Sequence, residues 1–563
     1  MLKRFGLRRS RRLILGVSLA AMTGGAAVAG MLVVSKPASV SVISQADAVR
    51  LAKQASFGPT VDLVNHIVSL GGAGAWLNEQ FNLNSSNYTD LSQRTAPIGY
   101  CSAMGTAAAA NCNRDYFTAT PVAMRFYANA VSGDDQLRQR VAFALSELIV
   151  ASDVNSHSTA GLAGFNQIFV TNAFGNYRDI LKAVTLHPYM ADFLNMADSS
   201  KTAPNENYAR ELMQLFSLGP VQLNADGSAK LDAGGVPLPA YTQDDIDNIA
   251  RALTGWTYTR LNGAPITDKK NLDYSQPMVP SPSLFDPTAK SFLGVNVPAG
   301  ATQQANVDAV VDAVFNNATT APFVSRHLIS QLVTANPSPA YVARISAVFA
   351  NNGSGVRGDL KAVVRAILLD PEARGDAKTG ANDGKVKEPV LLMTSLARLI
   401  GDKSDGYAFT VRDDAIGQPM FRSPSVFNFY PRDFPLPGGS GLVSPASKTL
   451  TTATIMARHN LVFSWIMTGP TPPAEYAVQT SIAGATGTQP DWSSWEAFGT
   501  NVDGILDRVN LLMMNNTMTT AQRAALRTAL LACRVDDPKA QTRRQAQAAI
   551  YVVATSPMFE VDR

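Results

Sequence analysis

The densest group of residues with chemical potential lies in the segment APNENYARELMQLFSLG, residues 203–219. Glu206 and Glu211 are paired carboxylates, of the kind that serve as a general acid and a general base. Arg210, between them, would bind an anion or orient a substrate. We predict these three residues as catalytic candidates, together with His187 of the segment TLHPYM.

The element that must present this group is a helix. At about 100° per residue, apolar and polar side chains fall on opposite sides. The apolar arc is Ala209, Leu212, Met213 and Phe216, and the polar arc is Asn207, Arg210, Glu211 and Gln214. One interpretation is structural, because Glu206 precedes Arg210 by four residues, an order that stabilises a helix. The other is a buried polar network with a shifted carboxyl pKa. Taken alone, the sequence favours the structural interpretation, since ion pairs also perturb titration.

Polar residues of several segments are candidates for substrate binding. They are Asn207, Arg251, Arg326, His327, Lys387 and Asn428. Each has a local alternative: His187 and His327 can pack or hydrogen-bond within the fold. The sequence does not show whether these residues share one cleft.

Short motifs for several kinds of enzyme are absent from the sequence. It contains no His-Glu-x-x-His, Glu-x-x-His or Cys-x-x-Cys, which disfavours a zinc, di-iron or haem enzyme. It also lacks a Gly-x-Ser-x-Gly elbow, a P-loop and a dinucleotide-binding glycine motif. The cofactor is therefore unknown. Metal content is unknown as well, because scattered carboxylates can hold calcium without a short motif.

Composition indicates a globular protein that does not bind nucleic acid. The chain has 563 residues, of which 46% are hydrophobic and 16% charged. Its net charge of +4 includes six basic residues within positions 3–12. The remainder of the chain is therefore faintly acidic, whereas phosphate binding needs a clustered basic face.

The basic N-terminus precedes an apolar run and reads as an export signal. The run ends in AVAG, where Ala27 and Ala29 occupy the small-residue positions preferred at a cleavage site. Arg11 and Arg12 resemble a twin-arginine signal, which carries folded proteins. An ordinary secretory signal and an uncleaved anchor are the alternatives. We predict a signal over residues 1–29, a short linker over 30–44, and a periplasmic or secreted protein.

The rest of the chain is predicted to be a mostly α-helical single domain, residues 45–563, with little β-structure. Helical periodicity recurs along it, as in DQLRQRVAFALSELIVASD. In YTQDDIDNIARALTGWT, Thr242 and Asp245 form a capping-box pattern, and Gly255 marks the expected end of that helix. No later segment has 18 unbroken apolar residues, so we expect no membrane span after signal removal.

Two stretches interrupt this helical pattern. Residues 258–303 and 402–448 are rich in proline, glycine and aromatic residues and poor in periodicity. We predict two long ordered loop insertions, a kind of segment that often carries binding surfaces.

The three cysteines are compatible with export. Cys101 and Cys112 flank a short flexible stretch and could close a disulfide loop, which would leave Cys533 unpaired. For Cys533, a small buried hydrophobic residue is the alternative to a redox role.

Several segments together resemble one bacterial family. They include DDQLRQRVAFALSELIV, NAFGNYRDILKAVTLHPYMADFLNM, NENYARELMQLFSLG, GVRGDLKAVVRAILLDPEAR and PSVFNFYPRDF. In this order they resemble the exported family catalogued as domain of unknown function 1800, from about residue 45 to the C-terminal SPMFEVDR. The resemblance implies export and a site at the NENYARELMQLFSLG signature. It also implies a genomic neighbour that resembles phosphatases and sulfatases.

Two functions follow from this sequence. The first is an exported enzyme, hydrolytic or lytic on an envelope or extracellular polymer, that uses carboxylate acid–base chemistry. The second is a non-catalytic helical scaffold or partner subunit for the co-exported phosphatase-like protein. A buried, converging site would favour the enzyme, and a flat apolar patch near residues 402–448 would favour the scaffold.

Overall fold

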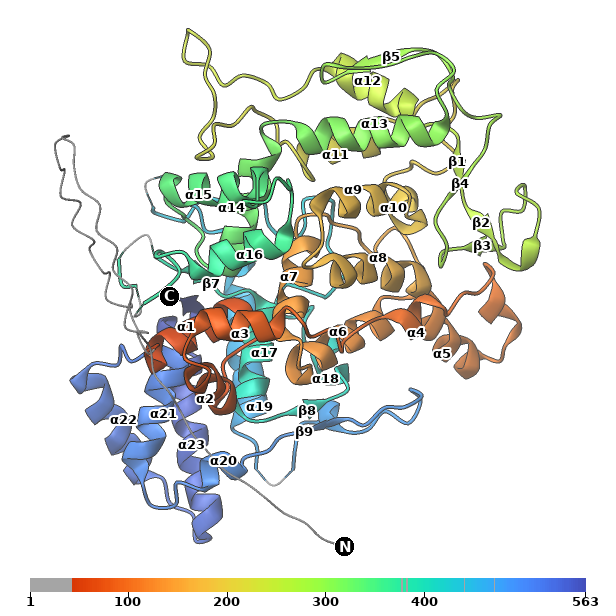
Figure 1. Ribbon diagram of the computed structural model, residues 1–563. Coiled ribbons are helices and arrows are strands. Elements are labelled where there is room, and N and C mark those ends of the chain that lie inside the picture. Colours follow the sequence, from red (N-terminus) through yellow and green to blue (C-terminus); the bar gives the residue numbers. More distant parts are fainter. Residues whose placement is uncertain (1–42, 376–377, 381–382, 440, 470) are drawn as a thin grey trace, which may run out of the picture. The chain divides into compact units, whose positions relative to one another are not determined.

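The computed structural model describes residues 43–563, apart from 376–377, 381–382, 440 and 470 (Figure 1). The predicted export signal, 1–29, and nearly all of the predicted linker lie outside the described residues. Residues 42–563 form one compact unit. Its described part contains 24 α-helices and ten short strands and is about half helical, which confirms the mostly α-helical fold.

The N-terminal third is helical. Ser44 and Thr60 cap the first two helices by accepting backbone N–H groups. The elements are α1 (Gln45–Ala55), α2 (Val61–Ser69), α3 (Ala73–Gln80), α4 (Thr89–Ser92), η1 (Tyr100–Ala103), α5 (Thr106–Phe117), α6 (Thr120–Ser132), α7 (Gln136–Ser146), α8 (Thr159–Asn172), α9 (Tyr177–Thr185) and α10 (Pro188–Phe193).

The middle of the chain alternates helices with short strands. It comprises α11 (Asn207–Gln214), α12 (Gln243–Ala252), β1 (Trp256–Thr257), β2 (Thr259–Arg260), η2 (Leu261–Gly263), β3 (Leu272–Asp273), β4 (Val279–Pro280), β5 (Lys290–Phe292), β6 (Val295–Val297), α13 (Gln303–Asn316), α14 (Thr320–Leu332), α15 (Pro339–Ala350) and α16 (Leu360–Leu369). The predicted loop over 258–303 therefore holds paired short strands rather than irregular chain alone.

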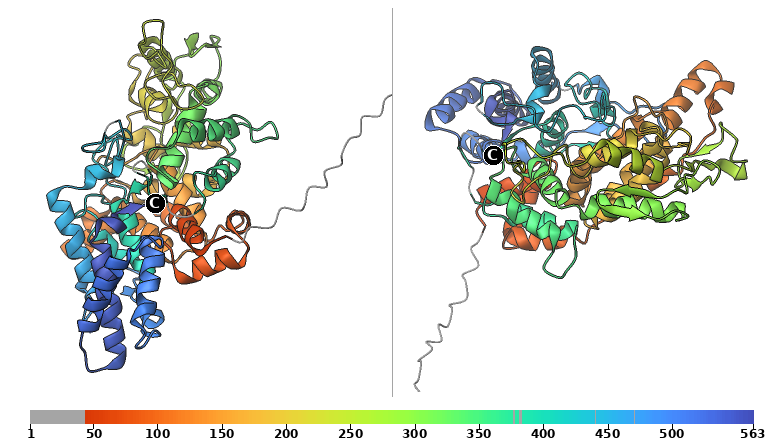
Figure 2. Two further views of the ribbon diagram at one scale, coloured as in Figure 1. Left: turned by 90° about the vertical axis from the view of Figure 1, so that its left-hand side faces the viewer. Right: turned by 90° about the horizontal axis from the view of Figure 1, so that it is seen from above.

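The C-terminal part is again helical. It comprises β7 (Lys385–Val386), α17 (Pro389–Leu399), β8 (Lys403–Ser404), α18 (Tyr407–Thr410), η3 (Pro445–Thr449), α19 (Thr452–Ile466), η4 (Ala474–Tyr476), β9 (Thr488–Gln489), α20 (Ser493–Glu496), α21 (Val502–Met514), α22 (Thr520–Ala532), α23 (Pro538–Ala554), α24 (Pro557–Glu560) and β10 (Val561–Asp562). Figures 1 and 2 show α20–α23 grouped together, away from α11–α13.

All sheets of the described chain are antiparallel pairs of two strands. Most join neighbouring segments, as β5 and β6 do. The pairs β7–β10 and β8–β9 join distant segments, with Val561 opposite Val386 and Lys403 opposite Gln489. These two pairs therefore tie the C-terminal helices to the rest of the unit.

Two local predictions can be compared with the helices. On α12, the capping box between Thr242 and Asp245 is present and confirmed. The helix ends at Ala252 rather than at Gly255, which follows with φ +86°. A Cβ atom at Gly255 would lie 2.8 Å from the Phe285 Cα, so this glycine is needed for close backbone approach.

Helix α7 lies in the centre of the core. It contacts α1, α3, α6, α8 and α14, and its apolar residues Leu137, Val141 and Leu145 are fully buried. Because helices cover it on several sides, the polar residues of α7 are also drawn into the core. Arg140, for example, has no exposed surface.

Candidate functional site

The predicted catalytic group on α11 lies near the protein surface. Glu206 precedes the first turn, and Arg210 Nη2 lies 2.8 Å from Glu206 Oε2. The two side chains are 42% and 39% exposed. Gln243 of α12 donates a hydrogen bond of 3.0 Å to the same oxygen of Glu206. This is the helix-stabilising pair expected from the spacing, and we call Glu206, Arg210 and Glu211 the α11 patch.

Glu211 differs from the rest of the α11 patch. Its Oε2 atom is buried and has no hydrogen-bond partner among the described residues. Burial raises the pKa of Glu211, and the nearby charge of Arg210 partly offsets the rise. The apolar arc beside it, Leu212 and Met213 included, is fully buried as predicted. Glu211 is thus the member of the patch with the environment of a proton donor.

His187 caps a helix. It lies at the N-cap of α10, where its Nδ1 accepts the Tyr189 backbone N–H at 3.2 Å. Its ring meets that of Phe165 edge to face. Burial lowers the pKa of His187 to about 3, so the ring is neutral at physiological pH. In the described chain, no hydrogen bond or ion pair joins His187 to the α11 patch.

Two predicted binding residues lie on α11 and on its neighbour α12. Asn207 is exposed at the start of α11. Arg251, at the other end of α12, pairs with Asp286 at 2.9 Å and hydrogen-bonds to Thr288. Arg251 therefore anchors the segment before β5.

The two predicted binding residues on α14 differ in exposure. Arg326 is exposed, whereas His327 is buried and donates from Nε2 to the Ala144 carbonyl at 2.8 Å. Burial and the charge of Arg432 lower the pKa of His327 to about 3. Adjacent positions on a helix face different directions, so Arg326 faces solvent and His327 faces the core.

Lys387 is buried beside the C-terminal strand. Its ammonium group donates to the Phe559 carbonyl at 2.9 Å and lies 3.4 Å from Asp562 Oδ1. Burial acts to raise the pKa of Asp562. The charges of Lys387, Lys53 and Lys385 outweigh this effect and lower that pKa. We call these four charged residues the lysine cluster. It explains why β10 stays paired with β7.

Asn428 leads to a second group of buried residues, which sequence analysis missed. Its amide donates a hydrogen bond to Oε2 of Glu147, which follows α7. The Tyr430 hydroxyl lies 3.4 Å from the same oxygen and also hydrogen-bonds to Glu388. With Arg140, these residues form what we call the Glu147 site. Glu147 is 8% exposed and Glu388 2%.

The electrostatics of the Glu147 site favour a protonated carboxyl. Burial, followed by the charge of Glu388, raises the pKa of Glu147 well above its ordinary value. Bonds from Asn428 and Tyr430 and the charge of Arg140 act in the opposite direction. Arg140 itself donates from Nη2 to the Gln331 carbonyl at 2.7 Å, while its buried Nε and Nη1 have no partner among the described residues.

A small cavity borders Glu147. It has a volume of about 20 Å³ and is lined by Glu147, Asn428, Asn166 and residues of the loop 420–429, which is room for about one water molecule. Phe421 and Asn428 adopt left-handed backbone conformations, with φ +63° and +62°. Such a conformation is costly for a bulky residue, and backbone strain of this kind is frequent at functional sites.

A sequence signal for this site did exist. Arg140 and Glu147 are seven residues apart, which places them on the same face two helical turns apart. Opposite charges on one face of a mostly apolar segment indicate a buried pair. Glu388 adjoins the predicted residue Lys387 in KEPV, and Tyr430 lies two residues after the predicted residue Asn428.

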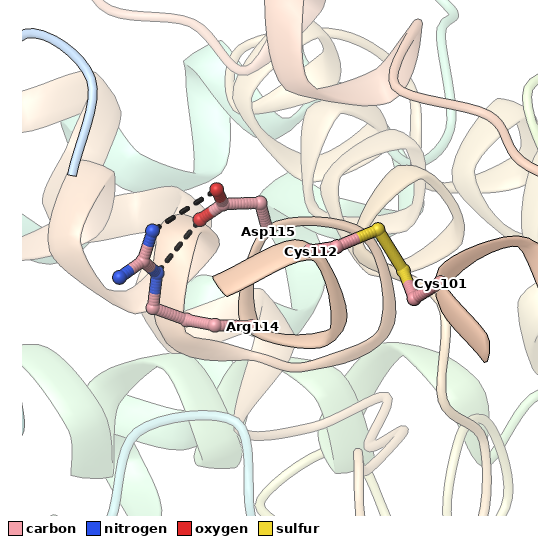
Figure 3. The surroundings of a disulfide bond; sticks show 4 residues. All are labelled: Cys101, Cys112, Arg114 and Asp115. Atoms are coloured by element: carbon pink, nitrogen blue, oxygen red, sulfur yellow. Dashed lines mark hydrogen bonds and ion pairs between the residues drawn. A yellow bond between two sulfur atoms is a disulfide. The ribbon is translucent and has the colours of Figure 1, made fainter. Parts of the chain in front are cut away.

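The predicted disulfide between Cys101 and Cys112 is present (Figure 3). Cys533 is free. The disulfide links η1, which contains Cys101, to α5, which contains Cys112. Next to it, Arg114 forms an ion pair with Asp115 at 2.7 Å and donates to the Ser481 carbonyl. The disulfide thus fixes a peripheral hairpin and lies outside the two polar groups described above.

The part of the chain that the structure describes was compared with the requirements of a metal site and of a membrane-spanning helix. Within the described residues, no three His, Cys, Asp or Glu side chains are grouped so that they could hold a metal ion. Of the helices in the same part of the chain, none has the length and apolar character needed to cross a membrane.

A family model matches most of this largely helical chain. The family model described as "Protein of unknown function (DUF1800)" matches residues 50–561. The chain belongs to this family. Searches of curated proteins and of solved structures found no match.

Proposed function

We propose that the protein is an exported enzyme, hydrolytic or lytic on an envelope or extracellular polymer, and that Glu147 is its general acid. The observation that carries this proposal is the environment of Glu147. It is a buried carboxyl with a raised pKa, beside a water-sized cavity and beneath a loop with left-handed backbone at Phe421 and Asn428. A carboxyl that keeps its proton at neutral pH can donate it to a leaving group.

The neighbours of Glu147 have complementary roles in this proposal. After proton transfer, the Glu147 carboxylate accepts the amide of Asn428 and lies in the field of Arg140, which stabilises its charge. Glu388 is the second carboxyl, linked to the first through the Tyr430 hydroxyl. After burial, the charge of Glu388 is the next cause of the raised pKa of Glu147, so we assign Glu388 to keeping the proton on Glu147.

The α11 patch is less suited to proton transfer than the Glu147 site. Glu206 and Arg210 are substantially exposed, and an exposed ion pair contributes little to stability. Burial raises the pKa of Glu211. We therefore assign the patch to polymer binding and Glu147 to proton transfer, so that the two sites can be separated by mutation.

The test compares Glu147→Gln with Glu206→Gln. Purified envelope polymers are incubated with each protein, and the released soluble products are measured by mass spectrometry. Loss of a general acid costs about 100-fold or more in rate, so Glu147→Gln should abolish release. Glu206→Gln should retain activity within a few-fold, and circular dichroism confirms that both variants fold. Equal activity of Glu147→Gln and the parent protein would refute the assignment.

A partner subunit for a co-exported protein is the second candidate, and exposed apolar residues favour it. Phe427, in the loop 402–448, is 52% exposed. On α19, Met456 and Phe463 are 56% and 55% exposed. Native mass spectrometry of the protein from its host periplasm distinguishes the candidates. A stoichiometric complex with another exported chain, without product release from any polymer, would favour the subunit.

Export itself is part of the proposal. The sequence of residues 1–29 supports a periplasmic or secreted location, as does the disulfide between Cys101 and Cys112. Fractionation of the host, with Arg11 and Arg12 both changed to lysine, tests the route. Retention of the changed protein in the cytoplasm is expected for twin-arginine export, and unchanged export would exclude that route.

A further inference from the structure

A pocket of about 580 Å³ opens where α6 and α17 end beside the strand pair β8–β9. This volume is within the range that accommodates small molecules. The polar residues that concern its chemistry are Ser132, Arg398, Asp402, Lys403, Thr486 and Gln489. It shares no lining residue with the cavity at Glu147. We call it the β8–β9 pocket.

The β8–β9 pocket contains two cations, Arg398 and Lys403, that form no ion pair within the described chain, although Lys403 interacts electrostatically with Asp491 outside the lining. Arg398 donates from Nε to the Gly58 carbonyl and from Nη1 to the Val131 carbonyl, both at 2.8 Å. It forms no ion pair within the described chain, and its Nη2 has no hydrogen bond there. Burial lowers the pKa of Arg398 to about 10, so it stays charged at neutral pH. Lys403 is exposed and has no ion pair among the described residues.

The carboxyl group in the lining does not neutralise these cations. Asp402 is 5% exposed, its Oδ1 has no hydrogen-bond partner in the described chain, and Tyr476 hydrogen-bonds to its Oδ2 at 3.5 Å. Burial raises the pKa of Asp402 to about 8. At neutral pH the pocket therefore carries the positive charges of Arg398 and Lys403 beside a neutral carboxylic acid.

Uncharged hydrogen-bonding groups surround these charges. Lys403 and Gln489 are direct partners across β8–β9, so their side chains lie on one face of the strand pair. The side chains of Ser132, Thr486 and Gln489 are exposed and make no hydrogen bond within the described chain. A ligand in the pocket would meet cationic, hydroxyl and amide groups together.

We propose that the β8–β9 pocket binds a small hydroxylated carboxylate, such as a uronic acid unit of a saccharide. Its carboxylate lies against Arg398 and Lys403, and its hydroxyl groups meet Ser132, Thr486 and Gln489. Since backbone carbonyls already occupy Nε and Nη1 of Arg398, only the Nη2 end is available to the ligand. That limited set of donors suits the two oxygens of a carboxylate better than the three of a phosphate. The proposal is independent of the chemistry at Glu147.

Isothermal titration calorimetry of the purified chain with D-glucuronate, glucose and glucose 6-phosphate tests this assignment. Glucuronate should bind most tightly. The variant Lys403→Gln should weaken it about three- to fivefold, the range for an exposed charge pair. The double variant Lys403→Gln, Gln489→Ala should weaken it about tenfold or more. Lys201→Gln, which removes an exposed lysine outside the pocket, is the matched control.

Three outcomes would overturn the proposal. They are binding of glucose as tight as that of glucuronate, preference for glucose 6-phosphate, and equal affinity in the parent and the double variant. Arg398 is left unchanged because its loss would release three backbone carbonyls, of Gly58, Ala130 and Val131, and could unfold the protein.

The pH dependence gives a second readout. The charged and titratable groups on the elements packed around Asp402 are Arg398, Lys403, Asp405, Glu475, Tyr476 and Asp491. Ionisation of Asp402 places a negative charge beside the ligand, so glucuronate should bind more weakly at about pH 9 than at about pH 6. Asp402→Asn should remove most of this loss. The same loss in Asp402→Asn and in the parent would contradict the assigned role of Asp402.

Discussion

Replacement of Asp402 by asparagine should stabilise the protein at neutral pH. In the folded chain burial raises the pKa of Asp402 to about 8, from an ordinary value of 3.8. At pH 7 the unfolded chain carries the carboxylate and the folded chain carries the acid. Each unit of pH between 3.8 and 7 costs about 1.4 kcal/mol, which gives roughly 4 kcal/mol. Asparagine has no such cost and can still accept the Tyr476 hydroxyl.

The sign of the pH dependence follows from the direction of the shift. Because the folded state holds the proton more tightly, the stabilising contribution of Asp402 is fully present below about pH 3.8. It is lost as the pH rises towards about 8. Urea denaturation of the parent and of Asp402→Asn at several pH values measures the difference. The two midpoints should agree near pH 4 and separate at higher pH, with the variant more stable.

Asp286 provides a control with the opposite sign. Burial acts to raise the pKa of Asp286, but hydrogen bonds from Thr288 and Arg251 outweigh this effect and lower that pKa to about 2. Asp286→Asn should therefore destabilise the protein at neutral pH, with the difference vanishing as the pH falls through the range between 3.8 and 2. If Asp402→Asn destabilises the protein equally at all pH values, the Asp402 carboxyl is not held neutral and the reasoning is refuted.

Three further changes test other parts of the structure. Asp562→Asn should destabilise the protein by about 3 kcal/mol or more, since Lys387 then stays buried beside other lysines without its carboxylate; urea denaturation measures this, and an unchanged midpoint would contradict it. Cys112→Ser opens a disulfide with a sequence separation of 11, which the loop-entropy model values at about 3 kcal/mol; a melting temperature equal to that of the parent would count against it. Arg210→Ala should cost less than about 1 kcal/mol, because its pair with Glu206 is exposed; a larger loss in the same denaturation assay would mean that the α11 patch is buried in solution.

Local sequence patterns predicted those features that depend on neighbours in the chain. The capping box of Thr242 and Asp245, the apolar arc of α11 and the pair of Glu206 with Arg210 all depend on spacings of three or four residues. A helix determines such relations by itself. The disulfide of Cys101 and Cys112 is equally local. These features were therefore open to prediction from one sequence.

The strand pairs β7–β10 and β8–β9 and the lysine cluster depend on distant segments and were not predicted. Pairing of β7 with β10 joins residues 385–386 to residues 561–562. Two-residue strands have too few positions to show an alternating pattern. Lys53, from the first helix, meets the same Asp562, and no periodicity within a helix reports such a contact.

The environment of α7 explains why the Glu147 site was also missed, and why it is the stronger candidate for function. Polar residues on a helix are expected to face water, but helices pack around α7 and bury Arg140 completely. Buried charges cost stability unless they are fully bonded, and apolar replacements are often more stable. The lysine cluster has a structural use, because it holds β10. At the Glu147 site, two nitrogen atoms of Arg140 have no hydrogen-bond partner in the described chain, and Glu147 holds Asn428 and Tyr430 of the loop 402–448. Those contacts do not require a raised carboxyl pKa, and it is this feature that the proposed proton transfer at Glu147 would use.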